Sequence, residues 1–139
     1  MQRPDGKVVA VQTTQLSAAG TKAAVTPCRI TTGALGAAAA RFAKATDMLG
    51  LAEGTETALA AMQLTGLPCW ASLGAGRMHR ICVPSTVREL HVFADADEPG
   101  RVAAERTADA HTKAGRRVVF RFPPQGSKDF ADLLAKVAA

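Results

Sequence analysis

Three carboxylates follow an apolar segment in the middle of the chain, and their chemistry stands out first. Residues 90–94 are mostly apolar, and Asp95, Asp97 and Glu98 follow them directly before Pro99. The branched and aromatic side chains predict a buried strand, and the proline-glycine pair predicts its end. Alternation along an extended chain places Asp95 and Asp97 on the same side. The two carboxylates can therefore share one hard cation.

A second apolar segment, residues 48–52, also ends in an acid, Glu53, and two further acids, Asp129 and Asp132, stand at the start of the last predicted helix. Ligands of open α/β sheets bind beyond the carboxyl ends of the strands, so neighbouring strands would bring these acids together. Clustered carboxylates raise one another's pKa unless a cation lies among them. This favours a divalent metal and metal-assisted phosphoryl chemistry, with Mg²⁺ or Mn²⁺ a better fit than Zn²⁺.

Each of these residues also has a purely structural interpretation. Asp97 is placed to cap a helix that begins near Arg101, and acids near turns often do no more than this. Glu56, one turn after Glu53, is interpreted as a first-turn acid favoured by the helix dipole. Lys128 and Arg101 either contact phosphate or only cover surface.

Composition sets broad limits on the protein class. The chain has 139 residues, is rich in alanine and poor in aromatic residues, and carries a formal charge of +5. This charge is compatible with a polyanionic partner such as nucleic acid. No apolar run is long enough for a membrane span and no signal peptide is evident, so we expect a cytoplasmic protein. Cys69, His79 and Cys82 are interpreted as core thiols and a surface histidine rather than zinc ligands.

The first 47 residues predict a β-rich lead-in segment. Residues 3–6 form a hairpin-turn signature, and residues 7–12 follow as its second strand. The first strand of that hairpin is missing from the sequence, so we expect this segment to be truncated. Residues 28–31 and 36–43 are expected to form further short strands.

Strands and helices alternate from residue 48 onward, which predicts one α/β domain over residues 48–139 with a mainly parallel sheet. Strands are expected at residues 48–54, 68–73, 90–94 and 117–122, with a flexible loop at 74–76. Helices are expected at residues 55–65, capped by Gly66, at 101–114, capped by Gly115, and after Asp129. The apolar residues expected to face the core in the first and last of these helices are Ala58, Leu59, Met62, Phe130, Leu133, Leu134 and Val137.

Three segments together resemble the Toprim domain, in particular the Toprim modules of phage and plasmid primases and primase–helicases. They are residues 51–60 (LAEGTETALA), 93–101 (FADADEPGR) and 126–134 (GSKDFADLL). The resemblance implies a Toprim-like (Rossmann-like) sheet flanked by helices, with a small N-terminal β extension. It also implies roles for six side chains. Glu53, Asp95 and Asp97 would be catalytic, with Asp129 they would bind Mg²⁺ or Mn²⁺, and Arg101 and Lys128 would hold phosphates.

The activity implied by this resemblance is primase-type nucleotidyl transfer, which makes an RNA primer on single-stranded DNA. The sequence has neither a zinc-ribbon cysteine set nor an ATPase P-loop, so a zinc-binding or helicase domain is expected as a partner. Two alternatives remain open, a Toprim nuclease and a non-catalytic module that binds nucleic acid or a partner protein. The basic face available to such a module consists of Arg101, Arg106, Lys113, Arg116 and Arg117.

Overall fold

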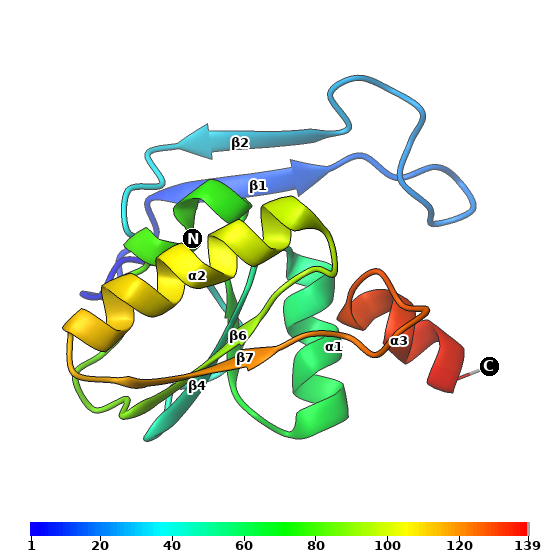
Figure 1. Ribbon diagram of the computed structural model, residues 1–139. Helices are drawn as coiled ribbons and strands as arrows, with labels where there is room; N and C mark the ends of the chain where they lie inside the picture. The colour runs from blue at the N-terminus through cyan, green and yellow to red at the C-terminus, as the bar shows by residue number, and fades with distance from the viewer. Residues whose placement is uncertain (139) are drawn as a thin grey trace.

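The computed structural model describes residues 1–138, which form two sheets (Figure 1). The small sheet is an antiparallel pair, β1 (Ala10–Thr14) and β2 (Arg29–Gly33). The large sheet has the order β3-β5-β4-β6-β7, in which only β3 is antiparallel. Its strands are β3 (Ala40–Arg41), β4 (Met48–Ala52), β5 (Cys69–Ala71), β6 (Glu89–Phe93) and β7 (Arg117–Arg121). The helices are α1 (Thr55–Thr65), the 3₁₀ helix η1 (Ala75–Arg80), α2 (Glu98–Lys113) and α3 (Phe130–Val137). The predicted α/β class is confirmed.

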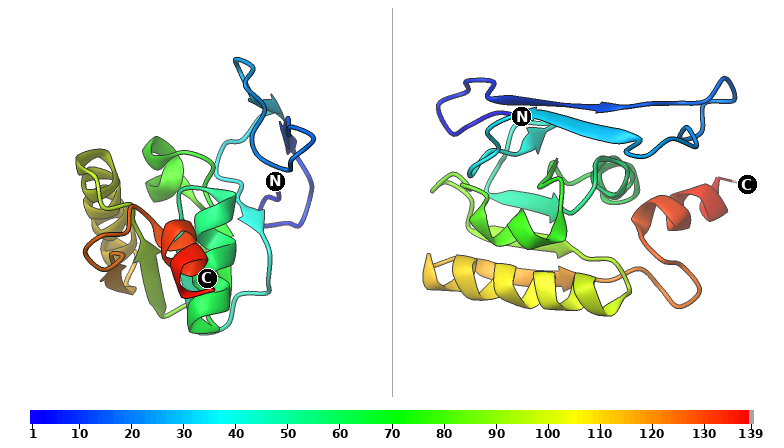
Figure 2. Two further views of the ribbon diagram at one scale, coloured as in Figure 1. Left: turned by 90° about the vertical axis from the view of Figure 1, so that its right-hand side faces the viewer. Right: turned by 90° about the horizontal axis from the view of Figure 1, so that it is seen from above.

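Helices cover both faces of the large sheet, because its central strands bury apolar side chains on both sides. Leu51 of β4 and Val92 of β6 belong to one core cluster, together with Met78 of η1 and Ala104 of α2. The alternate residues of the same strands pack against α1 and α3, where Phe93 lies edge-on to Phe130 with 5.0 Å between ring centroids. Figure 2 shows the β1–β2 hairpin and α2 on opposite sides of the molecule. This arrangement leaves the carboxyl ends of the parallel strands accessible.

Small side chains determine how α1 packs. The helix buries Ala58, Ala60 and Ala61, whereas Leu59 is 47% exposed. The prediction that Leu59 faces the core is therefore wrong, because the alanine face allows the helix to approach the sheet closely and turns the leucine outward. The predicted cap is confirmed. Gly66 adopts a left-handed conformation and its N–H donates to the carbonyl of Met62.

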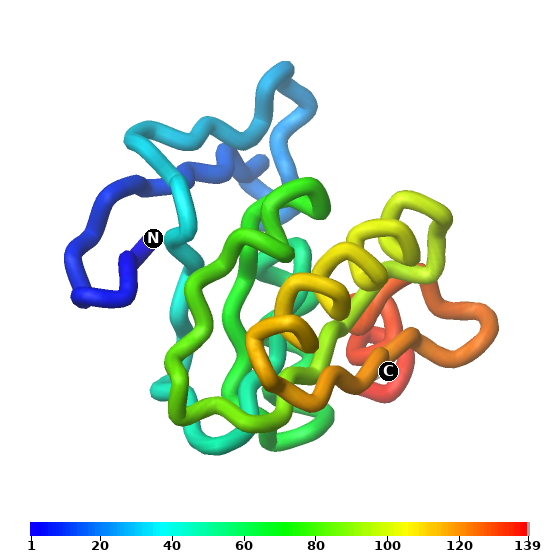
Figure 3. Tube along the Cα trace, turned by 60° about the vertical axis from the view of Figure 1, so that its left-hand side comes forward, coloured from blue at the N-terminus to red at the C-terminus, as the bar shows by residue number. Residues whose placement is uncertain are grey.

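The segment before β4 forms the hairpin at one side of the molecule (Figure 3). The predicted turn at residues 3–6 is present, and Gln2 bridges Val8 across it. The regular strand lies further on than predicted, at β1, and it pairs with β2 across the intervening loop. Of the expected strand at 36–43, only β3 is regular.

Three further boundaries differ from the predictions. Helix α2 begins at Glu98, before the expected Arg101, because a proline is tolerated in a first turn. The expected loop at 74–76 is instead the start of η1, which begins at Ala75 with Gly74 as its N-cap. Val137, expected in the core, is 69% exposed at the end of α3, so this part of the prediction is wrong. None of the helices in residues 1–138 has the length and apolarity needed to cross a membrane.

The buried face of α2 contains a histidine that should make the fold sensitive to acid. His111 is 5% exposed, and burial, then the charges of Arg116 and His79, lower its pKa from 6.5 to about 4. The unfolded chain therefore binds more protons than the folded chain between these two values. We expect the free energy of unfolding to fall as the pH drops from 6.5 toward 4. His111→Gln should flatten this slope in denaturant titrations at several pH values, and parallel curves for the two proteins would contradict the assignment.

Candidate active site

The pairing of β4 with β6 brings two of the predicted acids to the same edge of the sheet. The strands are parallel, with Ala52 opposite Phe93, so Glu53 and Asp95 follow at neighbouring strand ends. The backbone of Glu53 is fixed from the other side by the loop after β5. Its carbonyl accepts hydrogen bonds from the N–H groups of Leu73 (2.8 Å) and Gly74 (3.3 Å). Leu73 has a φ of 59°, which is uncommon for a leucine and marks a constrained turn at this position.

Asp95 is the most perturbed acid of the group. Its Oδ1 is buried and has no hydrogen-bond partner among residues 1–138. Burial, and then the negative charges of Glu53, Asp129 and Asp97, together raise its pKa to about 6. These four carboxylates are therefore close enough to interact electrostatically. The expected clustering at this edge is observed, with its expected consequence for the pKa.

Asp97 has the structural role that the sequence had left open for it. Its Oδ1 accepts a hydrogen bond of 2.8 Å from the N–H of Gly100, which caps α2. The first turn of α2 lies directly against the acidic loop. A Cβ atom on Gly100 would lie 2.6 Å from the carbonyl oxygen of Asp95 and 3.0 Å from Oδ1 of Asp97. Glycine at this position is therefore a condition for the geometry of both aspartates.

Asp129 also caps a helix, at the start of α3. Its Oδ1 accepts a hydrogen bond of 2.7 Å from the N–H of Asp132. The side chain of Asp132 is held by Lys136 (2.8 Å), and this hydrogen bond, with one from the backbone N–H of Lys128, lowers the pKa of Asp132. The carbonyl of Lys128 in turn accepts a hydrogen bond of 2.9 Å from the N–H of Ala96. The start of α3 is thereby tied to the acidic loop after β6.

A cavity of about 380 Å³ lies at this edge and combines acids with basic residues from distant parts of the chain. Among the predicted site residues, Glu53, Asp95, Asp129 and Lys128 line it. Asp97 and Arg101 are not in its lining. The guanidinium of Arg101 lies instead over the ring of Phe122, 5.1 Å from its centroid.

Two basic residues of this cavity, Lys22 and Arg29, were missed by the sequence analysis. They come from the loop between β1 and β2 and from β2 itself, and both form ion pairs with Glu56, Lys22 at 3.3 Å. Glu56 is thus more than the first-turn acid that was expected, since it anchors the hairpin beside Glu53. No local sequence signal could have placed Lys22 and Arg29 here, because a long-range contact brings them to the site.

The donor set at this edge fits a hard divalent cation. The buried, partnerless Oδ1 of Asp95 is an oxygen ligand that no protein donor satisfies, and other carboxylates surround it. Within residues 1–138, however, no three acid, histidine or cysteine side chains are positioned to hold one ion. Binding by three carboxylates would therefore require them to rotate toward one another.

The close contact at Gly100 leads to a first prediction for the site. Gly100→Ala should destabilise the fold by about 1–3 kcal/mol, because the new methyl group meets the rigid backbone of Asp95. It should also weaken metal binding by displacing the loop. Gly76→Ala is the matched control, since nothing lies within 4 Å of a Cβ at that position. Equal melting temperatures for the two variants would show that the loop can move freely.

The raised pKa of Asp95 leads to a second prediction. The folded chain holds this proton more tightly than the unfolded chain, so the free energy of unfolding should fall as the pH rises from about 4 to about 6. In EDTA at pH 7, Asp95→Asn should therefore be more stable than wild type, by about 1 kcal/mol after allowance for partial exposure. The difference should disappear near pH 4. Thermal melts at both pH values test this, and a less stable variant at pH 7 would refute it.

Comparison with known proteins adds independent information. The family model described as the Toprim domain matches residues 48–139. A search of curated proteins gave no match. Three similar solved structures illustrate the likeness in fold. The primase fragment of the bacteriophage T7 primase–helicase has a TM-score of 0.68 and 17% identity, over 98% of this chain and 55% of that chain.

The other two similar structures are also fragments of primases. The DnaG primase catalytic domain bound to single-stranded DNA has a TM-score of 0.70 and 19% identity, over 98% of this chain and 46% of that chain. The zinc-binding and RNA polymerase domains of Aquifex aeolicus primase have a TM-score of 0.71 and 17% identity, over 99% of this chain and 36% of that chain. The chain thus spans about half the length, or less, of these solved primases. Because the family model covers residues 48–139, most of the sequence, the chain belongs to the Toprim domain family.

Proposed function

We propose that this chain is the Toprim catalytic module of a DNA primase-like protein and carries out metal-dependent nucleotidyl transfer together with partner domains. The observation that carries the proposal is the unsatisfied Oδ1 of Asp95 in a cluster of carboxylates bordered by basic side chains. Paired acids and nearby cations are what phosphoryl chemistry requires, because the reacting phosphate must bind beside the groups that activate it. We also propose that residues 1–47 are a separate β-rich lead-in segment to the Toprim domain of residues 48–139.

The four acids have distinct roles in this proposal. Asp95, Asp97 and Asp129, with Glu53, would hold Mg²⁺ or Mn²⁺. When bound, the ion supplies charge stabilisation to the attacking and leaving oxygens. Glu53 would act as the general acid or base, as the resemblance to the Toprim family implies, and its side chain, unlike those of Asp97 and Asp129, caps no helix within residues 1–138.

The basic residues at the cavity would bind the phosphates of nucleotide and template. Lys128 is fixed by its backbone beside Ala96, and Lys22 and Arg29 reach the cavity from the hairpin. The hairpin would therefore contribute to substrate binding as well as to stability. Arg101 was expected to bind phosphate at this cavity. Its guanidinium lies over Phe122 instead, on the surface beside the cavity.

The partners follow from what the similar proteins contain. One of them is part of a primase–helicase, one was solved with single-stranded DNA, and one includes a zinc-binding domain. We infer that this module works on single-stranded DNA and nucleotides, with a helicase or zinc-binding domain of the same or an associated protein. A Toprim nuclease and a non-catalytic binding module are the alternatives. The capping roles of Asp97 and Asp129 favour the latter, because they give these acids a structural reason to be present.

The deciding experiment compares metal binding and turnover in matched variants. Calorimetric titration with Mg²⁺ and Mn²⁺ should show binding to wild type that falls about tenfold or more in Asp95→Asn. Asp109→Asn removes the same charge from an exposed site on α2 and should bind as wild type does. Glu53→Gln should lower ribonucleotide incorporation on single-stranded DNA on the order of 100-fold.

The possible outcomes separate the three functions. Incorporation by wild type, with partner domains supplied, supports the primase assignment. Cleavage of the DNA strand without incorporation would favour the nuclease. Wild type that binds no metal at millimolar concentration would overturn both catalytic assignments.

A further inference from the structure

An aromatic surface lies at the outer edge of the large sheet, beside the acids. Phe120 and Phe122 are 44% and 39% exposed, and their rings are nearly parallel, 23° apart with 6.2 Å between centroids. The guanidinium of Arg101 covers the ring of Phe122. With Glu105 these residues line a cavity of about 180 Å³. We call Phe120, Phe122 and Arg101 the aromatic platform.

The platform lies next to the proposed metal site. Arg121, between the two phenylalanines, accepts a hydrogen bond of 3.0 Å from the N–H of Ala94 through its carbonyl. Ala94 is the residue before Asp95. Arg101 lies on the first turns of α2, the helix that Asp97 caps. A strand of nucleic acid with a phosphate at the acids would therefore pass close to the platform.

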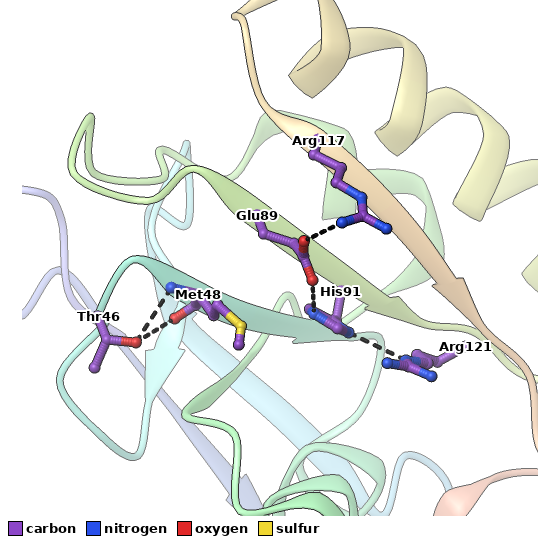
Figure 4. Close-up of polar contacts among 6 residues, drawn as sticks. All are labelled: Thr46, Met48, Glu89, His91, Arg117 and Arg121. Carbon is purple, nitrogen blue, oxygen red and sulfur yellow. Dashed lines mark hydrogen bonds and ion pairs between the residues drawn. The ribbon is translucent and has the colours of Figure 1, made fainter.

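The opposite side of β7 is already satisfied within the molecule. Arg117 forms an ion pair with Glu89 at 3.0 Å, and Glu89 contacts His91 at 2.7 Å (Figure 4). Arg121 donates from Nε to Nδ1 of His91 at 3.1 Å. Alternation along the strand places these arginines on one side and the phenylalanines on the other. The arginines of β7 thus have partners within the molecule, while Phe120 and Phe122 stay partly exposed on the other side.

Charge and shape together indicate what the platform binds. In a chain with only five phenylalanines and one tryptophan, two adjacent exposed rings beside a cation form a distinctive surface. Flat aromatic faces stack on nucleobases of any sequence, and an arginine beside them can reach the phosphate of the same nucleotide. The net charge of +5 attracts a polyanion such as nucleic acid, whereas it would not strengthen binding to an uncharged, apolar protein surface.

We propose that the aromatic platform stacks on an unpaired base of a single-stranded nucleic acid whose backbone runs past the acids. The proposal rests on the proposed function for its choice of ligand and extends it with a second contact outside the metal cavity. The platform holds the strand by its bases, and the metal site acts on phosphates. The platform therefore works without metal, which makes the two ideas separable by experiment.

The test measures strand binding in EDTA by fluorescence anisotropy. The probes are a labelled oligothymidylate and an abasic oligonucleotide of the same length and charge. Wild type should bind the oligothymidylate about tenfold more tightly than the abasic probe. Phe120→Leu/Phe122→Leu should lose this preference, whereas Phe120→Tyr/Phe122→Tyr should keep it because the flat rings remain. Phe42→Leu, at a ring that is 37% exposed elsewhere, is the matched control and should behave as wild type does.

Arg101→Gln provides an independent readout. It should weaken binding to both probes and lower the slope of log affinity against log salt by about one, as expected for one lost phosphate contact. Melting curves of all variants test whether they fold. If the leucine pair does not fold, the tyrosine pair and Arg101→Gln still test the proposal.

Three results would overturn the platform proposal. The first is equal affinity of wild type for the two probes, and the second is an unchanged preference in the leucine pair. The third is a leucine pair that binds both probes as wild type does but has lost a self-association that wild type shows in sedimentation. That result would make the platform a protein interface. Base preference without metal binding would leave the platform in place and count against the proposed catalysis instead.

Discussion

The parallel pairing of β4 with β6 is the constraint on which the rest of the site depends. It aligns the carboxyl ends of two buried strands, so that Glu53 and Asp95 follow at the same edge. Both strands bury apolar side chains on both faces, which favours helices on each side of the sheet and leaves the strand ends free. Loops after the neighbouring strands then fix this edge from both directions. Leu73 and Gly74 hold the carbonyl of Glu53, and Lys128 holds the N–H of Ala96.

The acids at this edge serve the fold and the chemistry at once. Asp97 and Asp129 cap helices with their side chains, whereas Oδ1 of the half-buried Asp95 is buried without a donor, and the pKa of Asp95 is raised. A site designed only for stability would not retain an unsatisfied carboxylate beside three others. The conflict between stability and local charge is typical of functional sites, and a cation would resolve it.

The hairpin and the outer edge extend the site on either side. Arg29 and Lys22 of the hairpin form ion pairs with Glu56 at one side of the cavity. The aromatic platform lies at the other side, where Ala94 bonds to the backbone of Arg121. Phosphates bound near Lys128 would thus have basic residues on one flank and flat rings on the other.

The sequence correctly predicted the α/β class, the strand ends that carry Glu53 and Asp95, and the cap at Gly66, because strand periodicity, caps and breakers act over a few residues. It could not determine which side of α1 faces the sheet, since alanine packing turned Leu59 outward against its hydrophobicity. It also could not bring Lys22 and Arg29 to the cavity or move Arg101 onto Phe122. Those positions arise from contacts between residues far apart in the chain, and only the tertiary structure decides them.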